Sequence, residues 1–275
     1  MIKMTQHRYY GIIPARYAST RFPGKPLAAI LGRPMFQHVY ERARKSRLLS
    51  QVTLATDDER IAAAARTAGV PFVLTRSDHQ SGSDRVFEAA MNLGLGPDTV
   101  LVNIQGDEPA LDPGHIDCLI APFMSDAAVK VTTLAHPLSA EDAANPNRVK
   151  VTFTADHTAL YFSRSPIPYI RNAPDEADLP VFFGHIGLYA YTLEALELFT
   201  RLPQGSLERL EGLEQLRFME HNIPIRVAVV DRPSQAVDVP DDIAGVEQIL
   251  LAENNKRRAA DSSSQLPEEI KCPWI

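Results

Sequence analysis

Short apolar runs alternate with helical patterns along most of this 275-residue chain. Runs rich in β-branched and aromatic residues, bounded by turn residues, predict strands at residues 9–14, 52–56, 72–75, 100–105, 129–135, 149–154, 185–191 and 225–230. Apolar residues at helical spacing predict helices at residues 34–46, 58–68, 83–93, 113–123, 193–200, 206–221 and 241–253. This alternation is typical of an α/β fold built on a mostly parallel sheet.

The same pattern indicates how the chain is divided. With 45% hydrophobic residues, the chain can bury a core that suits one large domain or two modest ones. Helical periodicity is lost near residue 254, where the composition becomes polar. We therefore expect one α/β domain over residues 1–253 and a C-terminal tail over residues 254–275.

Charge and cysteine usage exclude several classes of protein. A net charge of −6 argues against nucleic acid as a partner, because nucleic-acid-binding surfaces are strongly basic. The two cysteines, Cys118 and Cys272, are too few for a disulfide framework, and this favours a cytoplasmic protein. We also expect no membrane association, since no apolar run approaches the length of a membrane span.

A cationic loop directly follows the first predicted strand. The stretch PARYASTRFPGKP, residues 14–26, carries Arg16, Arg21 and Lys25. Ligands of open α/β sheets bind beyond the carboxyl ends of the strands, so these cations are placed to surround a polyphosphate. The loop lacks both the P-loop pattern and the glycine pattern of a dinucleotide-binding turn. A solvated basic loop is the alternative interpretation.

Two acidic turns contain candidate metal ligands. In NIQGDEP, residues 103–109, Asp107 follows a buried strand, and Gly106 allows the backbone to turn sharply. In QAVDVPDD, residues 235–242, Asp238 follows a later strand. Mg²⁺ is usually held by one or two carboxylates together with substrate phosphates. Each stretch by itself is also typical of an ordinary turn or a helix cap.

A predicted helix start forms another candidate site. The stretch DHQSGSDR, residues 78–85, contains Gln80, Ser81 and Gly82 just before an amphipathic helix. Helix N-termini offer free backbone N–H groups to anions. The alternative is a simple loop in which Ser81 and Asp84 cap the helix.

Two later stretches carry polar side chains at the spacing of one strand face or one helix face. GHIGLYAY, residues 184–191, puts His185, Gly187, Tyr189 and Tyr191 on one strand face, which indicates either a polar pocket wall or a structural histidine. SLERLEGLEQLRF, residues 206–218, is predicted as one helix with its acidic side solvated or accepting sugar hydroxyls. That side is formed by Glu208, Glu211, Glu214 and Gln215.

Taken in order, these stretches resemble the 3-deoxy-manno-octulosonate cytidylyltransferases, or CMP-Kdo synthetases. The resemblance is carried by IIPARYASTRFPGKPLA, TRSDHQSGSDR, VNIQGDEP, NPNRVKV, LYFSRSPIPY, HIGLYAY, LEQLR and VDVPDD, over residues 9–250. It implies the nucleotide-diphospho-sugar transferase fold, a Rossmann-like, mostly parallel mixed sheet with a smaller inserted dimerisation region. It also implies transfer of CMP from CTP to 3-deoxy-D-manno-octulosonate (Kdo), giving CMP-Kdo and pyrophosphate for lipopolysaccharide biosynthesis.

The resemblance also implies roles for individual residues. The implied metal ligands are Asp107 and Asp238, which would bind Mg²⁺. The implied catalytic residues are Asp107, Asp238, Arg16 and Lys25. The implied CTP-binding residues are Arg16, Arg21, Lys25, Gln80, Ser81, Gly82 and Arg85. The implied sugar-binding residues are Gln105, Arg164, His185, Tyr189, Glu211 and Gln215. A homodimer is implied as well.

Other functions stay open from sequence alone. A cytidylyltransferase for 8-amino-Kdo or sialic acid would differ in the wall around Arg164, His185, Tyr189 and Glu211. A non-catalytic nucleotide-binding module would bind CTP and release no pyrophosphate, but two candidate carboxylates, Asp107 and Asp238, argue against it. An interaction protein that uses the acidic helix face would leave the cationic loop without a role.

Overall fold

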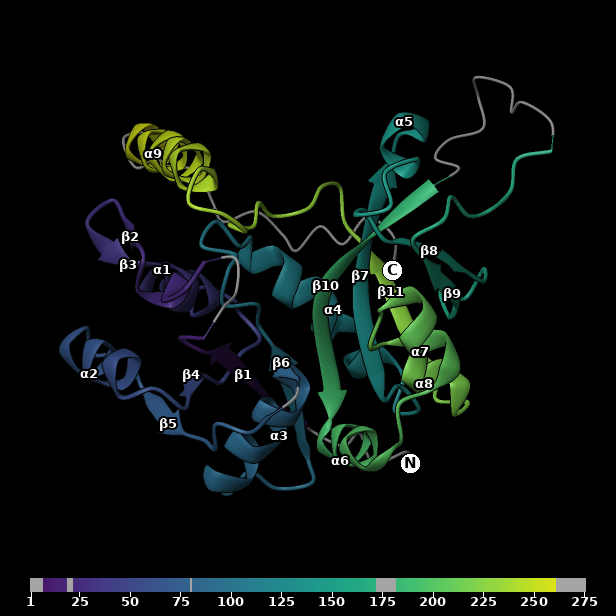
Figure 1. Ribbon diagram of the computed structural model, residues 1–275, viewed down its shortest axis with the longest axis horizontal. Coiled ribbons are helices and arrows are strands. Elements are labelled where there is room, and N and C mark those ends of the chain that lie inside the picture. Colours follow the sequence, from purple (N-terminus) through teal and green to yellow (C-terminus); the bar gives the residue numbers. More distant parts are fainter. Residues whose placement is uncertain (1–6, 19–21, 80, 172–181, 261–275) are drawn as a thin grey trace.

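The computed structural model describes residues 7–18, 22–79, 81–171 and 182–260. Within these ranges one nine-stranded sheet has the order β11-β7-β10-β6-β1-β4-β5, with β8 paired to β10 and β9 paired to β8 (Figure 1). Its strands are β1 (Arg8–Ala15), β4 (Gln51–Thr56), β5 (Phe72–Leu74), β6 (Thr99–Asn103), β7 (Val131–Leu138), β8 (Lys150–Phe153), β9 (Ala159–Ser163), β10 (Phe182–Thr192) and β11 (Arg226–Val229). A small separate ribbon joins β2 (Ala29–Ile30) to β3 (Arg33–Pro34).

The sheet is mixed, with parallel pairing on both sides of one reversed strand. The pairs β5–β4, β4–β1, β1–β6 and β7–β11 are parallel. Strand β10 runs antiparallel to both β6 and β7. The expected mostly parallel mixed sheet is confirmed, and the carboxyl ends of β1, β4 and β6 meet at one edge, where ligands of such sheets bind.

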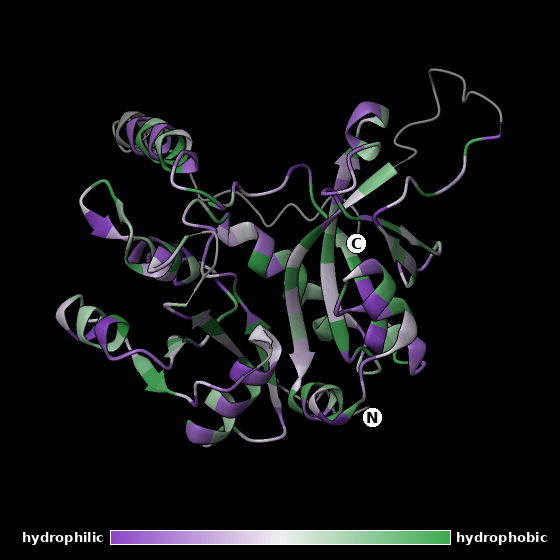
Figure 2. Ribbon diagram, viewed as in Figure 1, coloured by the Kyte–Doolittle hydropathy of each residue, from purple (hydrophilic) through white to green (hydrophobic). Residues whose placement is uncertain are grey.

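Helices cover both faces of the sheet. Successive strand residues point to opposite faces, so Ile12 and Ile13, both fully buried, belong to two different core clusters. Ile13 packs in the cluster that includes α1, α2 and α4, and Ile12 packs in the cluster that includes α3, α6 and α8. The helices are α1 (Met35–Ala43), α2 (Glu59–Thr67), α3 (Gly82–Asn92), α4 (Pro113–Ser125), α5 (Ala140–Ala143), α6 (Leu193–Arg201), α7 (Ser206–Glu211), α8 (Leu216–Glu220) and α9 (Asp242–Ala260). Figure 2 shows hydrophobic and hydrophilic residues mixed along α3, whose apolar side faces the sheet as in an amphipathic helix.

The predicted helix over residues 206–221 is wrong. The chain forms two short helices, α7 and α8, because Gly212 adopts a left-handed conformation with φ 62° and ends α7. Glu211 and Gln215 are therefore not one turn apart on a single helix, and the continuous acidic face does not exist. Strand β9 was not expected, although all of it except Ala159 lies within the LYFSRSPIPY stretch.

The last helix is longer than the sequence pattern predicts. It continues to Ala260, beyond the expected end at residue 253. Its inner side packs in a small apolar cluster with Ile30 and Val237, and Glu247 Oε1 accepts a hydrogen bond of 2.7 Å from the Leu31 backbone N–H. These contacts hold α9 beside β2 and β3 (Figure 1).

One cysteine of the described residues takes part in a disulfide. Cys118 on α4 is 3% exposed and is disulfide-bonded. With two cysteines in the chain, a disulfide framework remains excluded, and one disulfide does not test the expected cytoplasmic location. Across the ranges that the structure describes, no helix has both the length and the apolar composition of a membrane span.

Candidate active site

Three adjoining cavities lie at the carboxyl ends of β1 and β6 and along β10. The first has a volume of about 310 Å³ and the second about 270 Å³, and both are lined by Pro14, Gly82, Gln105 and Glu214. The third, of about 760 Å³, shares His185 and Gly187 with the second. Together they form one continuous site at the sheet edge where ligands are expected.

The cavities collect most of the residues that the sequence singled out. The first is lined by Arg16, Lys25, Ser81, Gly82, Arg85, Gln105 and Asp107. The second is lined by Gln105, His185, Tyr189 and Gln215, and the third by His185 and Asp238. Arg21 and Gln80 lie outside the described residues.

The side chain of Lys25 lies between the two predicted metal ligands. Its Nζ is 2.7 Å from Asp107 Oδ2 and 3.9 Å from Asp238 Oδ1, and it donates a 2.7 Å hydrogen bond to the Val237 carbonyl. The backbone N–H of Val237 in turn donates to the Asp107 carbonyl at 2.8 Å. Two acidic turns far apart in the sequence are thus joined around one ammonium group.

Gly106 allows the Asp107 turn to approach the end of β1. A Cβ atom at this position would lie 2.9 Å from the Pro14 carbonyl oxygen, closer than real Cβ contacts. A side chain there would therefore push the turn, and Asp107 with it, away from the cationic loop. This close approach explains why a glycine precedes the carboxylate.

The two carboxylates are donors that could hold one metal ion whose other ligands would be phosphate or water oxygens. In the part of the chain that the structure describes, no three His, Cys, Asp or Glu side chains form a closed metal site. Two carboxylates without a third match Mg²⁺, which usually takes one or two carboxylates and keeps other positions for phosphate and water. The ammonium of Lys25 shows that a cation is accommodated between them.

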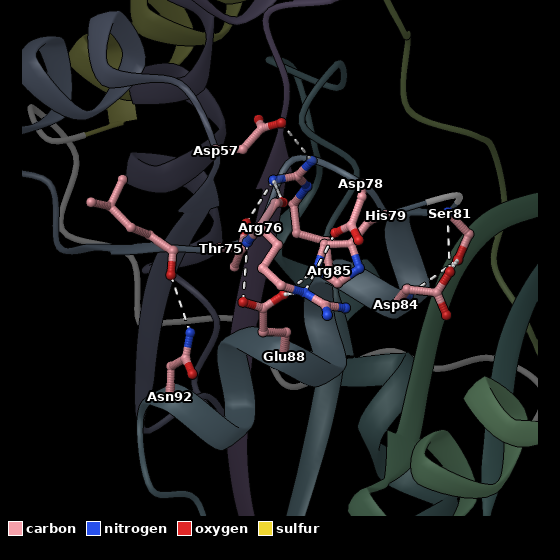
Figure 3. Close-up of polar contacts among 11 residues, drawn as sticks. Asp57, Thr75, Arg76, Asp78, His79, Ser81, Asp84, Arg85, Glu88 and Asn92 are labelled. Carbon is pink, nitrogen blue, oxygen red and sulfur yellow. Dashed lines mark hydrogen bonds and ion pairs between the residues drawn. The ribbon is translucent and has the colours of Figure 1, made fainter.

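The start of α3 borders the first cavity, and Figure 3 shows Ser81 and Asp84 in contact there. The Ser81 hydroxyl accepts a hydrogen bond from the Asp84 N–H, and the Asp84 carboxylate accepts one from the Ser81 N–H. This capping box confirms the predicted cap by Ser81 and Asp84. It orients the helix N-terminus, with its free N–H groups, at the cavity.

Arg85 is held in place beneath the same cavity. Its guanidinium donates 2.6 Å to the Thr75 hydroxyl and lies 3.2 Å from the Asp57 carboxylate, and the residue is 4% exposed (Figure 3). Asp57 Oδ1 is buried and has no hydrogen-bond partner among the described residues. A buried cation that is already held by such contacts loses little side-chain entropy when a ligand binds, so its positive charge is fixed in place.

A polar cluster on β10 lines the second cavity. His185 Nε2 is 2.9 Å from the Tyr189 hydroxyl and 3.0 Å from the Thr133 hydroxyl. Burial, with His136 as a smaller cause, lowers the pKa of His185 to about 3. Burial also raises the pKa of Tyr189. At neutral pH both side chains are therefore uncharged hydrogen-bonding groups.

The lowered pKa of His185 makes acid stability a testable property. The unfolded chain binds a proton on this histidine below pH 6.5, whereas the folded protein binds it only near pH 3. The contribution of neutral His185 to the free energy of unfolding is therefore complete above pH 6.5 and is lost as the pH falls below that value. We expect His185→Gln to flatten the decrease in the free energy of unfolding between pH 7 and pH 5, measured by urea titration, with His7→Gln as control. Equal pH dependence in wild type and His185→Gln would contradict this expectation.

Arg164 and Glu211 are not brought into these cavities. Arg164 Nε donates 2.7 Å to the Glu211 carbonyl, and its NH1 donates 3.1 Å to the Pro146 carbonyl. The Glu211 carboxylate accepts hydrogen bonds from the Ser163 hydroxyl at 2.7 Å and from the Arg164 N–H at 2.9 Å. In this structure both side chains instead link β9 to the end of α7, because α7 stops at Glu211.

Some lining residues were not among the expected site residues. Glu214 lines the first and second cavities, and burial raises its pKa. Asn103 lines the second cavity, and its buried Oδ1 has no partner among the described residues. His79 lines the first cavity and hydrogen-bonds Glu88 through Nε2 (Figure 3). All three stand inside the motifs DHQSGSDR, NIQGDEP and SLERLEGLEQLRF, and this position is the sequence signal that could have found them.

Comparisons with known proteins agree with this geometry. The profile of the cytidylyltransferase family matches residues 10–225. The 3-deoxy-manno-octulosonate cytidylyltransferase of Nitratidesulfovibrio vulgaris is 57% identical over 246 residues, covering 90% of this chain and 97% of that protein. The protein of the same name from Lawsonia intracellularis is 48% identical over 242 residues, covering 88% of this chain and 94% of that protein.

A solved structure shares the fold as well. The structure of CMP:2-keto-3-deoxy-manno-octonic acid synthetase complexed with CTP superposes with a TM-score of 0.84 at 41% identity, covering 90% of this chain and 99% of that one. A cytidylyltransferase from Leptospira borgpetersenii, 16% identical with a TM-score of 0.59, shares the fold alone and covers 96% of this chain and 100% of that one. The chain is therefore a member of the cytidylyltransferase family, among the 3-deoxy-manno-octulosonate cytidylyltransferases.

Proposed function

We propose that this protein transfers CMP from CTP to Kdo and releases pyrophosphate. The observation that carries the proposal is the position of Lys25 between Asp107 and Asp238, beside a cavity lined by further cations. An adjoining cavity is lined by neutral hydrogen-bonding side chains. The first cavity suits a polyphosphate and the second suits a polyhydroxylated partner. The homologues and the related CTP complex support this assignment of substrates.

In this proposal the first cavity binds CTP. Arg16 is exposed at the mouth of the cavity, and Lys25 lies deeper. Their charges, with Arg85 below and the α3 N-terminus beside them, neutralise the triphosphate inside a protein whose net charge is −6. We also propose the CTP role of Arg21 and Gln80, which rests on the family resemblance.

The second and third cavities bind the sugar acid. His185, Tyr189 and Gln105 supply hydrogen bonds to its hydroxyls, and Gln105 lies where the first and second cavities meet. The anomeric hydroxyl attacks the α-phosphorus as the bond to pyrophosphate breaks, and its proton passes to solvent. Such reactions depend mainly on positioning and charge stabilisation. The expected roles of Arg164 and Glu211 at the sugar would require both to leave their present partners.

We further propose Mg²⁺ as the cofactor, held by Asp107 and Asp238. The bound ion would polarise phosphate oxygens and lower the pKa of a coordinated hydroxyl. The ammonium of Lys25 would then be displaced from between the carboxylates and would turn to the phosphates.

The test is pyrophosphate release from CTP with Mg²⁺, measured in parallel with Kdo, 8-amino-Kdo and sialic acid. We expect release that depends on Kdo. Release only with another sugar acid would keep the reaction and reassign the sugar pocket. Folded protein that binds CTP and releases no pyrophosphate with any of them would contradict the proposal and would indicate a binding module.

We also propose the pathway and the cellular location of the reaction. CMP-Kdo serves lipopolysaccharide biosynthesis, and a cytoplasmic location follows from the use of CTP, a cytoplasmic nucleotide. A single disulfide at Cys118 does not decide between compartments.

We propose that the protein is a homodimer formed through the region around β8 and β9. Leu160 on β9 is 58% exposed and Tyr169, in the loop that follows, is 89% exposed. We expect light scattering to give twice the chain mass of 30.4 kDa, and Leu160→Glu to shift the protein toward monomer, since a charge in an apolar contact is costly. Leu74→Glu on β5, where the leucine is 50% exposed, is the control. A monomeric wild type, or a Leu160→Glu variant that remains dimeric, would contradict this.

A further inference from the structure

A bulge in β10 creates the polar cluster of the second cavity. In a regular strand, residues four positions apart are separated by about 13 Å. His185 and Tyr189 are four positions apart, yet their ring centroids lie 5.4 Å apart. The register between β10 and β7 shifts between Ile186 and Tyr189, where the two strands lie side by side (Figure 1). The bulge thus folds one part of the strand toward the other and brings the two rings into contact.

Thr133 on β7 lies directly opposite this bulge. Its hydroxyl oxygen is 2.9 Å from the Leu188 carbonyl oxygen, 3.2 Å from the Ile186 carbonyl oxygen and 3.0 Å from His185 Nε2. Thr133 is fully buried and does not line the cavities. It therefore acts on a ligand only through His185 or through the backbone.

The hydroxyl of Thr133 has one proton to share among three neighbours. Carbonyl oxygens accept only, so the proton of Thr133 goes to Leu188 or Ile186. Two hydroxyl oxygens then face His185 Nε2, that of Thr133 at 3.0 Å and that of Tyr189 at 2.9 Å. A proton on Nε2 serves both contacts, whereas a lone pair on Nε2, even if it accepted from Tyr189, would face the lone pairs of the Thr133 oxygen. If Thr133 donated to Nε2 instead, two carbonyl oxygens would face an oxygen atom with no proton between them, which is unfavourable in a buried site.

The second ring nitrogen of His185 is then a hydrogen-bond acceptor. Nδ1 makes no hydrogen bond to any described residue, and the side chain of His185 is only partly buried. The ring lines both the second and the third cavity. In neutral imidazole, protonation at Nε2 leaves a lone pair on Nδ1.

We propose that Thr133 is a positioning residue whose hydroxyl holds His185 in the Nε2–H tautomer, so that Nδ1 accepts a hydrogen bond from a hydroxyl of the sugar acid. The identity of this ligand rests on the proposed function, whereas the tautomer does not. Thr133 acts through His185 and touches neither substrate.

The tautomer can be measured in the free protein. We expect ¹⁵N NMR of histidine-labelled wild-type protein to show His185 protonated at Nε2, with its signals assigned by their loss in His185→Gln. Thr133→Val removes the hydroxyl and should produce the Nδ1–H form or a mixture. Thr133→Ser keeps the hydroxyl and should preserve the Nε2–H form. Thr132→Val is a matched control, because Thr132 is equally buried on β7 and donates to the Leu119 carbonyl instead.

Kinetics provide the second readout. Loss of one well-placed hydrogen bond should raise the KM for Kdo about tenfold in Thr133→Val, while the KM for CTP stays unchanged. Thr133→Ser should restore the KM for Kdo, and Thr132→Val should leave it unaltered. A general loss of structure would instead change both KM values or the unfolding temperature of the control.

Each outcome bears on the proposal. Wild-type His185 in the Nδ1–H tautomer would overturn it, and this result needs no variant to fold. An unchanged tautomer and KM for Kdo in folded Thr133→Val would overturn it too. If wild-type protein releases no pyrophosphate with Kdo, the proposed function fails, while the tautomer measurement still decides whether Thr133 orients His185.

Discussion

Replacing Asp107 by Asn is expected to lower turnover by at least about a hundredfold, the scale seen when one charge-stabilising group is lost from an active site. Asp107 lines the first cavity and pairs with Lys25 at 2.7 Å. The substitution keeps the shape of the side chain and removes its charge, so a cation shared with Asp238 would be held by one carboxylate. The measurement is pyrophosphate release at saturating CTP and Kdo over a range of Mg²⁺ concentrations.

The fold should survive this change. Asp107 has a partly exposed side chain, at 32%, and ion pairs of this kind contribute little to stability. The control is Asp126→Asn, which removes a carboxylate 3.3 Å from Arg226, outside the three cavities of the site. We expect this control to keep wild-type turnover. Near-normal turnover in Asp107→Asn would remove Asp107 from the reaction.

Replacing Glu208 by Gln is expected to lower the free energy of unfolding by about 3 kcal/mol, because breaking one partner of a buried ion pair leaves the other charge unpaired. The Glu208 side chain is 3% exposed and accepts hydrogen bonds from Arg217 at 2.7 and 2.5 Å. The Arg217 guanidinium also lies 4.4 Å from the centre of the Phe199 ring. This pair joins α7 to α8, whose connecting residues line the second cavity.

An exposed pair on α6 provides the comparison. Glu197 and Arg201 also form an ion pair, but their side chains are 42% and 73% exposed. Glu197→Gln should therefore cost less than about 1 kcal/mol. The measurement is urea unfolding of both variants and wild type at neutral pH. Equal losses in the two variants would show that burial does not distinguish the pairs.

The sheet and much of the site were predictable because local patterns determine them. Ile12 and Ile13 are both apolar because helices cover both sheet faces. The continuous apolar pattern of β6 has the same cause, since this strand is buried and lies between β10 and β1. The cations and Asp107 follow β1 and β6, which are adjacent and parallel. Their meeting therefore followed from the general position of ligand sites in such sheets.

Other features depend on contacts that no local pattern encodes. The residues on either side of Gly212 favour helix equally well, so its left-handed conformation decides the break between α7 and α8. Arg164 donates to backbone carbonyls of distant residues, and a carbonyl acceptor leaves no trace in the sequence. The bulge of β10 lies against Thr133, a residue of another strand whose hydroxyl contacts the Leu188 carbonyl.

The most direct test of the central claim is identification of the product by mass spectrometry. CTP, Kdo and Mg²⁺ are incubated with the protein, and CMP-Kdo and pyrophosphate are quantified together. We expect equal amounts of the two products, with neither formed when Kdo is omitted. Free CMP in place of CMP-Kdo, or pyrophosphate formed without Kdo, would contradict transfer of CMP to the sugar.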